Sequence, residues 1–436
     1  MTAGKPDSSE SAKGRGATPF AQLEPPGHSS TGLTGEQRRA IFLDDDALRD
    51  NADIQKNLET FGCDLSLIEF PEWQRTKHVH RLHPYLGKFI PQLVELFLRR
   101  FFHEGETVLD PFAGSGTTLV EASILGMPSV GIELSAFNCR IIEAKTRRYD
   151  PEALRREVAD ALARVEQFSD ELACKGRLRF HRRLDTESDY LRAWLAPRSL
   201  QQVLFYRSIL ADYEHRDVLR IILSRATRSA RLIPHYDLAR PKQPLKPGVE
   251  YYCAKHKRMC RPIEDARKFF RRYSRDTVTR IAEYDELRSD AAVTVVEGDA
   301  RTAPLPEGLR LDGVLTSPPY VGMIDYHEQH RYAYELFPEV ERRDEAEIGP
   351  MALGKSKKAR AAYQADIAAV FRRLRPHLVP GAKVFVVAND RHELYPAIGA
   401  AAGLRLVDVF HRPVPMRTER DSATYFESIF WFEPGA

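Results

Sequence analysis

Residues 107–118 read TVLDPFAGSGTT, and the strongest local signals of the chain lie here. Thr107–Asp110 is a short, apolar and β-branched run that is typical of a buried strand, while Thr117–Leu125 has a helical composition. Between them, Gly114 and Gly116 let the backbone turn tightly and approach a ligand, to which the start of the helix offers free N–H groups. The stretch therefore predicts a strand, a ligand-binding glycine turn and a helix.

Strand-like and helical segments alternate outward from this stretch. Helices are expected before it, at Glu36–Thr60 and at Phe89–Phe102, where apolar residues recur at three-to-four spacing. The later strands are expected at Ser129–Glu133, Thr294–Glu297, Leu311–Leu315, Lys383–Ala388, Leu404–Phe410 and Phe426–Phe432. This alternation predicts the α/β class, with a parallel sheet that carries helices on both faces.

The strand pattern stops between Ala136 and Asp290, where mostly helical patterning predicts a large insertion into the sheet domain. Helices are expected there at Pro151–Leu172, Asp189–Tyr213, Arg216–Leu232 and Glu264–Leu287. The chain then divides into a Gly-, Ser- and Pro-rich tail at 1–36, which we expect to be flexible, two parts of the sheet domain at 37–145 and 292–436, and the insertion at 146–291.

Composition excludes several classes of protein. The 436 residues are 43% hydrophobic and 29% charged, as in globular proteins rather than fibrous or disordered chains. They contain no apolar run of membrane-spanning length, and the N-terminal residues lack the apolar stretch of a secretory signal. Because five scattered cysteines do not form a disulfide framework, we expect a cytoplasmic protein without membrane contact.

The net charge of +3 hides an uneven distribution. Residues 240–280 contain thirteen Lys or Arg against four Asp or Glu, a local balance of +9 inside the expected insertion. Such a block favours an anionic partner such as nucleic acid, although a solvated helical face would give the same pattern. Phosphate contacts are expected near the start of the last insertion helix, from Arg267, Lys268, Arg271, Arg272 and Arg275.

A second motif, TSPPY at residues 316–320, directly follows the strand expected at Leu311–Leu315. Its two prolines stiffen the backbone and lack N–H donors, so the carbonyls beside Ser317 are held in place as free acceptors. This corner suits a planar ligand with an amino group, on whose ring Tyr320 stacks. A stiffened loop is the plainer interpretation, but both motifs follow strands of the same sheet.

An acid follows the glycine turn at the distance that an adenosine site needs. Glu133 lies seventeen residues beyond Gly116, at the end of the next strand, where a carboxylate can accept both ribose hydroxyls. An exposed strand-end acid is the plainer alternative. The third glycine of the dinucleotide fingerprint is missing, because Leu119 stands there, and this disfavours a nicotinamide cofactor.

Together, residues 110–118 and 316–320 resemble the amino-group DNA methyltransferases that use S-adenosylmethionine, in the branch with Ser-Pro-Pro-Tyr that makes N4-methylcytosine. Residues 83–91, HPYLGKFIP, resemble the family segment that precedes the glycine motif. The resemblance covers roughly 75–145 and 292–433 and implies a Rossmann-like methyltransferase sheet. It also implies double-stranded DNA as partner and the role of modification enzyme in a restriction-modification system, where a cognate restriction endonuclease would be a further partner.

The resemblance also assigns roles to individual residues. It implies that S-adenosylmethionine is bound by His83, Tyr85, Lys88, Asp110, Phe112, Ala113, Gly114, Gly116, Thr117, Glu133 and Asp299, and that the catalytic motif is Ser317, Pro318, Pro319 and Tyr320. The glycine turn would hold the methionine part, Glu133 the ribose and Asp299 the adenine amino group. The insertion precedes Asp299, unlike the usual family order, so its assignment as DNA-recognition region is weaker than that of the sheet as catalytic domain.

The proposed chemistry follows from the substrate atom. An exocyclic amine is a poor nucleophile because its lone pair is delocalised into the ring, and hydrogen bonds to Ser317 and the Pro318 carbonyl would favour a pyramidal nitrogen. The base must first leave the duplex, where Tyr320 would stack on it. Methylation of a ring carbon would need a cysteine nucleophile, typically after proline, and none of the five cysteines follows a proline.

Three other functions share parts of this pattern. Adenine-N6 methylation of DNA has the same motifs, although Ser317 favours cytosine because the adenine enzymes more often have an acid there. An RNA methyltransferase would use the basic block equally well. A nucleic-acid-binding protein with a degenerate cofactor pocket is disfavoured by the intact motif residues.

The basic block also contains Cys253, His256 and Cys260, whose Cys-x2-His-x3-Cys spacing offers three zinc ligands. A structural zinc site needs four ligands, and only a distant residue such as His235 or Cys174 could supply the last one. Incidental cysteines beside solvated Lys and Arg are the simpler interpretation, so we expect no metal.

Overall fold

The computed structural model describes residues 51–67, 76–85, 90–174, 184–235, 237, 241–322, 325–350, 354, 356–414 and 425–435. The tail expected at 1–36 and Lys88 lie outside these residues, as does the first part of the helix expected at Glu36–Thr60. The described part of that helix is α2 (Asn51–Phe61). None of the described helices is long and apolar enough to span a membrane.

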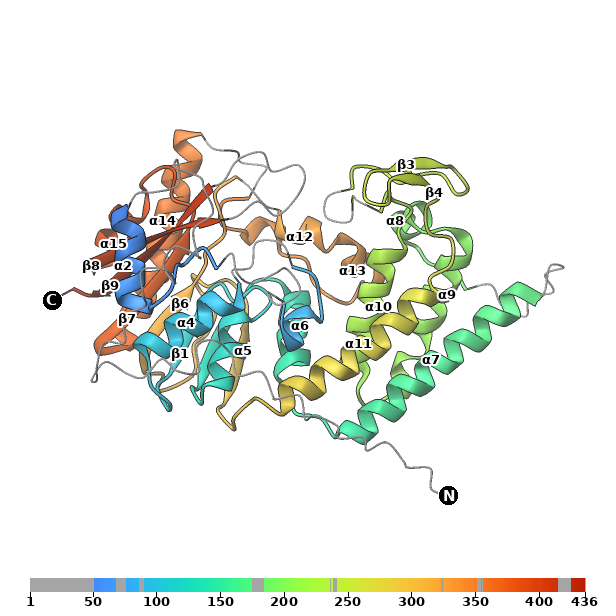
Figure 1. The fold of residues 1–436 in the computed structure, drawn as a ribbon, viewed down its shortest axis with the longest axis horizontal. Coiled ribbons are helices and arrows are strands. Elements are labelled where there is room, and N and C mark those ends of the chain that lie inside the picture. Colours follow the sequence, from blue (N-terminus) through green and yellow to red (C-terminus); the bar gives the residue numbers. More distant parts are fainter. Residues whose placement is uncertain are drawn as a thin grey trace, which may run out of the picture. The chain divides into compact units, whose positions relative to one another are not determined.

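Seven strands form the central sheet, in the order β5-β2-β1-β6-β7-β9-β8 (Figure 1). They are β1 (Val108–Asp110), β2 (Ser129–Glu133), β5 (Val293–Glu297), β6 (Leu311–Thr316), β7 (Leu378–Ala388), β8 (Leu404–Val414) and β9 (Tyr425–Pro434). β9 runs antiparallel to both of its neighbours, and every other adjacent pair is parallel. All seven expected strands are confirmed, in a Rossmann-like sheet.

Side chains of β7 show that both faces of the sheet are covered. The flanking helices are α4 (Pro91–Phe101), α5 (Thr117–Ile124), α6 (Ala136–Thr146), α14 (Lys357–Leu374) and α15 (Tyr395–Ala401). Val384 and Val386 belong to the core beneath α14 and α15. Phe385, between them, packs instead against Phe97 and Phe101 of α4, at ring-centroid distances of 5.1 and 4.6 Å. The expected helices on both faces are therefore confirmed.

The insertion runs between α6 and β5 and contains both helices and a hairpin (Figure 1). Its elements are α7 (Pro151–Cys174), α8 (Asp189–Trp194), α9 (Pro197–Ser208), α10 (Arg216–Ala230), β3 (Tyr251–Cys253), β4 (Arg258–Cys260) and α11 (Arg267–Asp285). The prediction of a single helix at Asp189–Tyr213 is wrong, because Pro197 begins a new helix and the preceding Ala196 is extended. The hairpin was not expected, since three-residue strands are too short to show a periodic pattern.

Shorter helical elements complete the described fold. They are η2 (His78–Arg81), η3 (Leu210–Asp212), α12 (Tyr326–Gln329), α13 (Arg331–Leu336), η4 (Asp344–Ala346) and η6 (Arg375–His377).

The insertion shares a hydrophobic core with the sheet domain. Val120 of α5 and Phe137 of α6 are buried in the same cluster as Leu219 of α10 and Phe270 of α11. Tyr332 of α13, which follows β6 in the chain, belongs to it as well. Removing the insertion would expose this core, so the insertion is an integral layer of the fold.

Candidate functional site

The two motifs meet where the strand order of the sheet reverses. β1 lies between β2 and β6, because Leu109 pairs with Val130 on one side and with Val314 on the other. Residues that follow β1 and β6 therefore lie at the same edge, where parallel α/β sheets leave a crevice. A cavity of about 820 Å³, open to solvent, is found here. Its walls come from the glycine turn, the end of β2, the segment after β5, the Ser317 motif, α12 and residues 346–348.

The glycine turn has the backbone conformation that its residues predict. Gly114 and Gly116 have φ angles of +53° and +79°, in the left-handed region, and Gly116 caps the N-terminus of α5. A Cβ on Gly114 would lie 3.0 Å from Cε1 of Tyr85, whose ring lies over the turn, whereas a Cβ on Gly116 would meet Ile142. Gly114 borders the cavity and Gly116 does not. Phe112, Ala113 and Thr117 border it as expected.

Asp110 is buried behind the turn and does not line the cavity. Its carboxylate accepts hydrogen bonds from Thr118 Oγ1 at 2.8 Å, from Thr316 Oγ1 at 2.6 Å and from the Phe112 N–H at 3.1 Å. Burial raises the pKa of Asp110 to about 6 against the effect of these three donors. Asp110 thus joins β1 to α5 and β6, and its expected role in binding the cofactor stays a prediction.

Glu133 reaches the cavity from the end of β2. Oε2 accepts from the Gly114 N–H at 2.7 Å, and Oε1 accepts from the Ser135 N–H at 2.8 Å and from Asn138 Nδ2 at 3.1 Å. Burial raises the pKa of Glu133 to about 7, although these donors and the nearby His327 oppose the shift. A carboxylate has about four acceptor positions, so three donors orient it and leave capacity for a ligand hydroxyl.

Asp299 lines the cavity just beyond β5. Arg301 donates to its carboxylate from Nε at 3.0 Å and from Nη2 at 2.7 Å, and Arg301 Nη1 donates to Asp366 on α14 at 2.9 Å. A two-pronged guanidinium contact fixes the plane of a carboxylate. Asp299 is therefore held at the cavity wall with its charge balanced.

Tyr85 and His83, from the segment before the glycine motif, lie in different places. Tyr85 lines the cavity, but His83 does not. The buried His83 ring places Nε2 at 3.0 Å from Ser224 Oγ of α10 and at 3.3 Å from the Tyr332 hydroxyl of α13. Burial lowers its pKa well below the usual value, so the ring is neutral. The ring of His83 thus joins the sheet domain to the insertion, and its expected role over the cofactor stays a prediction.

The Ser-Pro-Pro-Tyr motif begins directly after β6, and both Ser317 and Pro319 border the cavity, whereas Pro318 does not. The Tyr320 hydroxyl donates to Glu427 Oε1 at 3.0 Å, and the other oxygen of Glu427 accepts from Arg412 Nε at 2.9 Å. Arg412 and Glu427 form a buried ion pair between β8 and β9, with side chains 1% and 7% exposed. Tyr320 is therefore anchored to the antiparallel end of the sheet.

His327 and Glu347 are among the cavity residues that were not assigned from the sequence. His327 of α12 donates from its backbone N–H to Glu347 Oε1 at 2.9 Å, and its ring Nδ1 donates to the same carboxylate. The other ring nitrogen accepts from the Arg343 N–H at 3.3 Å. His327 stood close to the catalytic motif in sequence, but no local pattern points to Glu347, which only the fold brings to the cavity.

The five basic residues expected to bind phosphate differ in their environment. Arg267 donates to Asp265 and to Asp170 of α7, and Arg271 forms an ion pair with Glu166 of α7. These two contacts hold α11 against α7 and neutralise the two charges. The side chains of Lys268, Arg272 and Arg275 are exposed, and neither of the last two forms an ion pair within the described part of the chain.

Comparison with known proteins shows the family to which this chain belongs. A family model described as DNA methylase matches residues 35–144. The chain is 39% identical, over 439 aligned residues, to the type II methyltransferase M.MjaII of Methanocaldococcus jannaschii, with 84% of this chain and 82% of that relative covered. The chain belongs to the amino-group DNA methyltransferases. A shorter match, 34% identical over 84 residues, covers 19% of this methyltransferase and 18% of the type II methyltransferase M.MvaI of Kocuria varians.

The methyl donor of this DNA methyltransferase is S-adenosylmethionine, and the cavity residues fit it. The cavity lies at the switch point of the sheet, and a Cβ at Gly114 would narrow it against Tyr85. Glu133 and Asp299 present oriented carboxylates that suit hydroxyl and amino donors. Glu133 would hold the ribose and Asp299 the adenine, as the sequence predicts.

Cofactor binding should depend on the ionisation of Glu133. Since its pKa of about 7 in the folded protein lies above the usual value of 4.5, the carboxylate takes up a proton as the pH falls through 7 and loses acceptor capacity. We expect the dissociation constant of S-adenosylmethionine to rise below pH 7, by up to about tenfold per pH unit. Glu133→Gln should weaken binding at pH 8 by about 1.5 to 3 kcal/mol and remove this pH dependence.

Isothermal titration calorimetry between pH 6 and 8 measures both effects. Glu297→Gln is the matched control, because Glu297 pairs with Glu133 in register at the end of the adjacent β5 but does not border the cavity. A Glu133→Gln protein with the affinity and pH profile of the parent would contradict the assignment.

Proposed function

We propose that this DNA methyltransferase methylates the exocyclic N4 amine of cytosine, as the modification enzyme of a restriction-modification system. The observation that carries the proposal is the neutral Ser317 at the cavity wall, within Ser-Pro-Pro-Tyr and next to Pro319. The type II methyltransferases among its relatives support the restriction-modification role, in which a cognate endonuclease is the expected partner enzyme.

The residues of the chain would activate the amine by orienting it. S-adenosylmethionine supplies an electrophilic methyl group on a sulfonium when it is bound. Ser317 Oγ and the Pro318 carbonyl would each accept a hydrogen bond from one N–H of the amine. These bonds favour a pyramidal nitrogen, whose lone pair then faces the cavity. After transfer, the nitrogen releases one proton to solvent, and no covalent bond to the protein is needed.

Tyr320 would provide the stacking surface for a flipped base. Its hydroxyl is held by Glu427, whose charge is balanced by Arg412. Removing either partner of a buried pair leaves an uncompensated charge, at a cost of about 3 to 5 kcal/mol. This contact with β9 fixes the Tyr320 ring before a base binds. Stacking of the base then costs little conformational entropy of the side chain.

The insertion would bind the DNA backbone through a basic hollow. Its lining includes Arg81, Arg225, Arg228 and Arg272, with Asp276 as the one acid among the described lining residues. Asp276 accepts from Arg225 Nη2 at 2.7 Å, so the hollow keeps an excess of positive charge. Such a surface suits phosphate, which carries no base information.

On α11, the exposed Lys268, Arg272 and Arg275 extend this surface. Arg267 and Arg271 are engaged with acids of α7 and should contribute less to binding. The insertion then supplies most of the sequence-independent affinity, while the cavity selects the base.

Ser317→Ala should lower the single-turnover rate of methyl transfer by about 10²-fold, because a positioned hydrogen-bonding group at the reacting amine is lost. Binding of S-adenosylmethionine should not change, since Ser317 acts on the target base. Ser208→Ala is a matched control, as this exposed hydroxyl on α9 only donates to the Phe205 carbonyl at 2.7 Å. An unchanged rate in Ser317→Ala would show that the motif is structural.

The product should be N4-methylcytosine. The neutral Ser317 and a backbone carbonyl suffice to orient the amine of a small pyrimidine, whereas Tyr320 stacks on any base. Methylated DNA is digested to nucleosides, which are separated and identified by mass spectrometry. If N6-methyladenine is the product, the cytosine assignment is wrong, whereas the assignments of the family and of the cofactor are unaffected.

Replacing Lys268, Arg272 and Arg275 together with Gln should weaken binding to all DNA sequences alike. Each lost phosphate contact lowers the slope of log K against log salt by about 0.9, so the slope should fall by about 2 to 3. The charge-matched control replaces Arg156, Arg372 and Arg405, exposed on α7, α14 and β8, with Gln. Equal salt slopes for the two triple variants would place the DNA surface elsewhere.

A further inference from the structure

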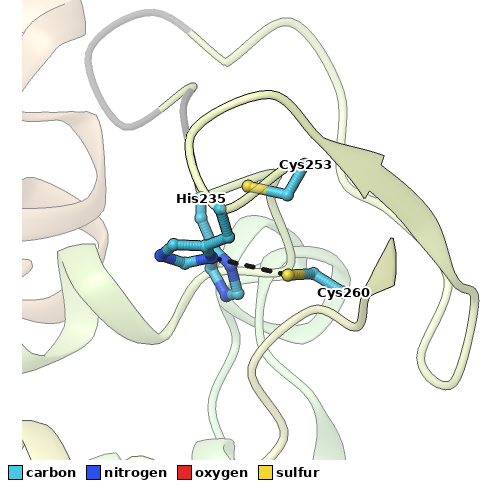
Figure 2. A group of neighbouring side chains, drawn as sticks. His235, Cys253 and Cys260 are labelled. Atoms are coloured by element: carbon cyan, nitrogen blue, oxygen red, sulfur yellow. Dashed lines mark hydrogen bonds between the residues drawn. The ribbon is translucent and has the colours of Figure 1, made fainter. Parts of the chain in front are cut away.

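Four side chains with metal-binding groups meet at the β3–β4 hairpin of the insertion. Cys253 ends β3, His256 lies in the turn and Cys260 ends β4, while His235 comes from the segment after α10. Figure 2 shows His235, Cys253 and Cys260 directed toward one another. One ligand atom from each of the four residues lies within 4.8 Å of the other three. Residues that are far apart along the chain thus form one compact donor set.

The spacing of the donor atoms is close to that of a tetrahedral zinc site. Zn–S bonds of about 2.3 Å and Zn–N bonds of about 2.0 to 2.1 Å hold the ligand atoms about 3.3 to 3.8 Å apart. His256 Nδ1 already lies 3.4 Å from Cys260 Sγ, the contact that is dashed in Figure 2. None of the separations exceeds 4.8 Å, so a contraction of at most about 1 to 1.5 Å brings all four atoms to the spacing of a zinc site.

His235 provides an independent sign of an absent ligand. Its Nδ1 is buried and has no hydrogen-bond partner among the described residues. Burying a polar atom without a partner costs about 1 to 3 kcal/mol, which a bound ion would offset. The Tyr251 hydroxyl accepts from the His235 backbone N–H at 2.9 Å, and the two rings pack edge to face. These contacts with β3 keep the imidazole beside the two thiols.

The hairpin lacks an apolar core that would otherwise stabilise it. Each strand has three residues, and the cross-strand pair of Tyr252 and Met259 is 61% and 56% exposed. A two-stranded hairpin of this size is marginal in water. A metal ion that joins both strands to the segment of His235 would supply the missing stabilisation.

We propose that His235, Cys253, His256 and Cys260 bind one Zn²⁺ as a structural site. Two thiolates balance the charge of the ion, with release of two thiol protons, and two imidazoles complete the tetrahedron. Thiolate and imidazole donors favour Zn²⁺ over Mg²⁺ or Ca²⁺, which prefer oxygen. Cys174 was the other sequence-based choice for the fourth ligand, but its side chain lies outside the described residues, and the geometry points to His235.

A second cluster among the described residues, His78, His80 and Glu121, differs in one decisive respect. The Glu121 carboxylate accepts from Lys77 Nζ at 2.8 Å and already contacts His80 Nε2 at 2.7 Å. The ammonium group of Lys77 supplies the positive charge that a metal would bring. This cluster therefore carries no metal proposal.

The test is the zinc content of the full-length protein, measured by inductively coupled plasma mass spectrometry after zinc loading and dialysis into metal-free buffer. We expect one zinc per chain, and a strong visible absorption of tetrahedral cobalt thiolate after Co²⁺ replacement. Cys253→Ser and Cys260→Ser should lose the ion. Cys63→Ser, a half-buried cysteine outside the cluster, should keep it.

Two readouts separate loss of the site from loss of the fold. His256→Ala should leave the protein folded, with S-adenosylmethionine binding unchanged, but should release zinc at lower chelator concentration than the control His392→Ala. The proposal is overturned by a wild-type protein without stoichiometric zinc, by full zinc retention in Cys253→Ser, or by a Cys253–Cys260 disulfide in the mass of the purified chain. None of these outcomes depends on which base is methylated.

Discussion

The buried carboxylate of Asp110 is the contact on which the cofactor edge depends. It accepts from Thr118 on α5, from Thr316 at the end of β6 and from the Phe112 N–H in the glycine turn. A carboxylate in an apolar interior is tolerated only when it is hydrogen-bonded. Moving any one of the three donors away from Asp110 would therefore cost several kcal/mol of folding free energy. Thr316 directly precedes Ser317, so the Asp110 carboxylate fixes the Ser-Pro-Pro-Tyr motif relative to the glycine turn.

The three acids that line the cavity are also oriented before any ligand binds. Glu133 is held by backbone N–H groups, Asp299 by Arg301, and Glu347 by His327. Acceptors that are already aligned lose little freedom when a hydroxyl or an amine binds, so more of the interaction energy appears as affinity. The arginines proposed to attract DNA line a separate hollow, formed mainly by the insertion.

The insertion and the cofactor edge behave as one packed unit, because α10 and α11 share their core with α5 and α6. His83 reinforces this joint, since its neutral ring contacts both Ser224 of the insertion and Tyr332 of α13. A DNA duplex bound by the insertion, as proposed, would therefore be held at a set position relative to Ser317. The metal site, at the hairpin of the same insertion, would stabilise a part of the surface that this core does not reach.

Short-range signals were enough for the seven strands, the glycine turn and the Ser-Pro-Pro-Tyr corner, since β-branched runs, positive φ at glycine and proline stiffness act within a few residues. The same signals could not separate Gly114, at the cavity, from Asp110, which supports it from behind. Charge counting likewise could not distinguish the paired Arg267 from the exposed Arg272, because the acids that neutralise a cation come from other helices. His235 also reaches the cysteines of the hairpin only through tertiary packing. The segments that carry them are distant in sequence, so no local sequence pattern indicates the contact.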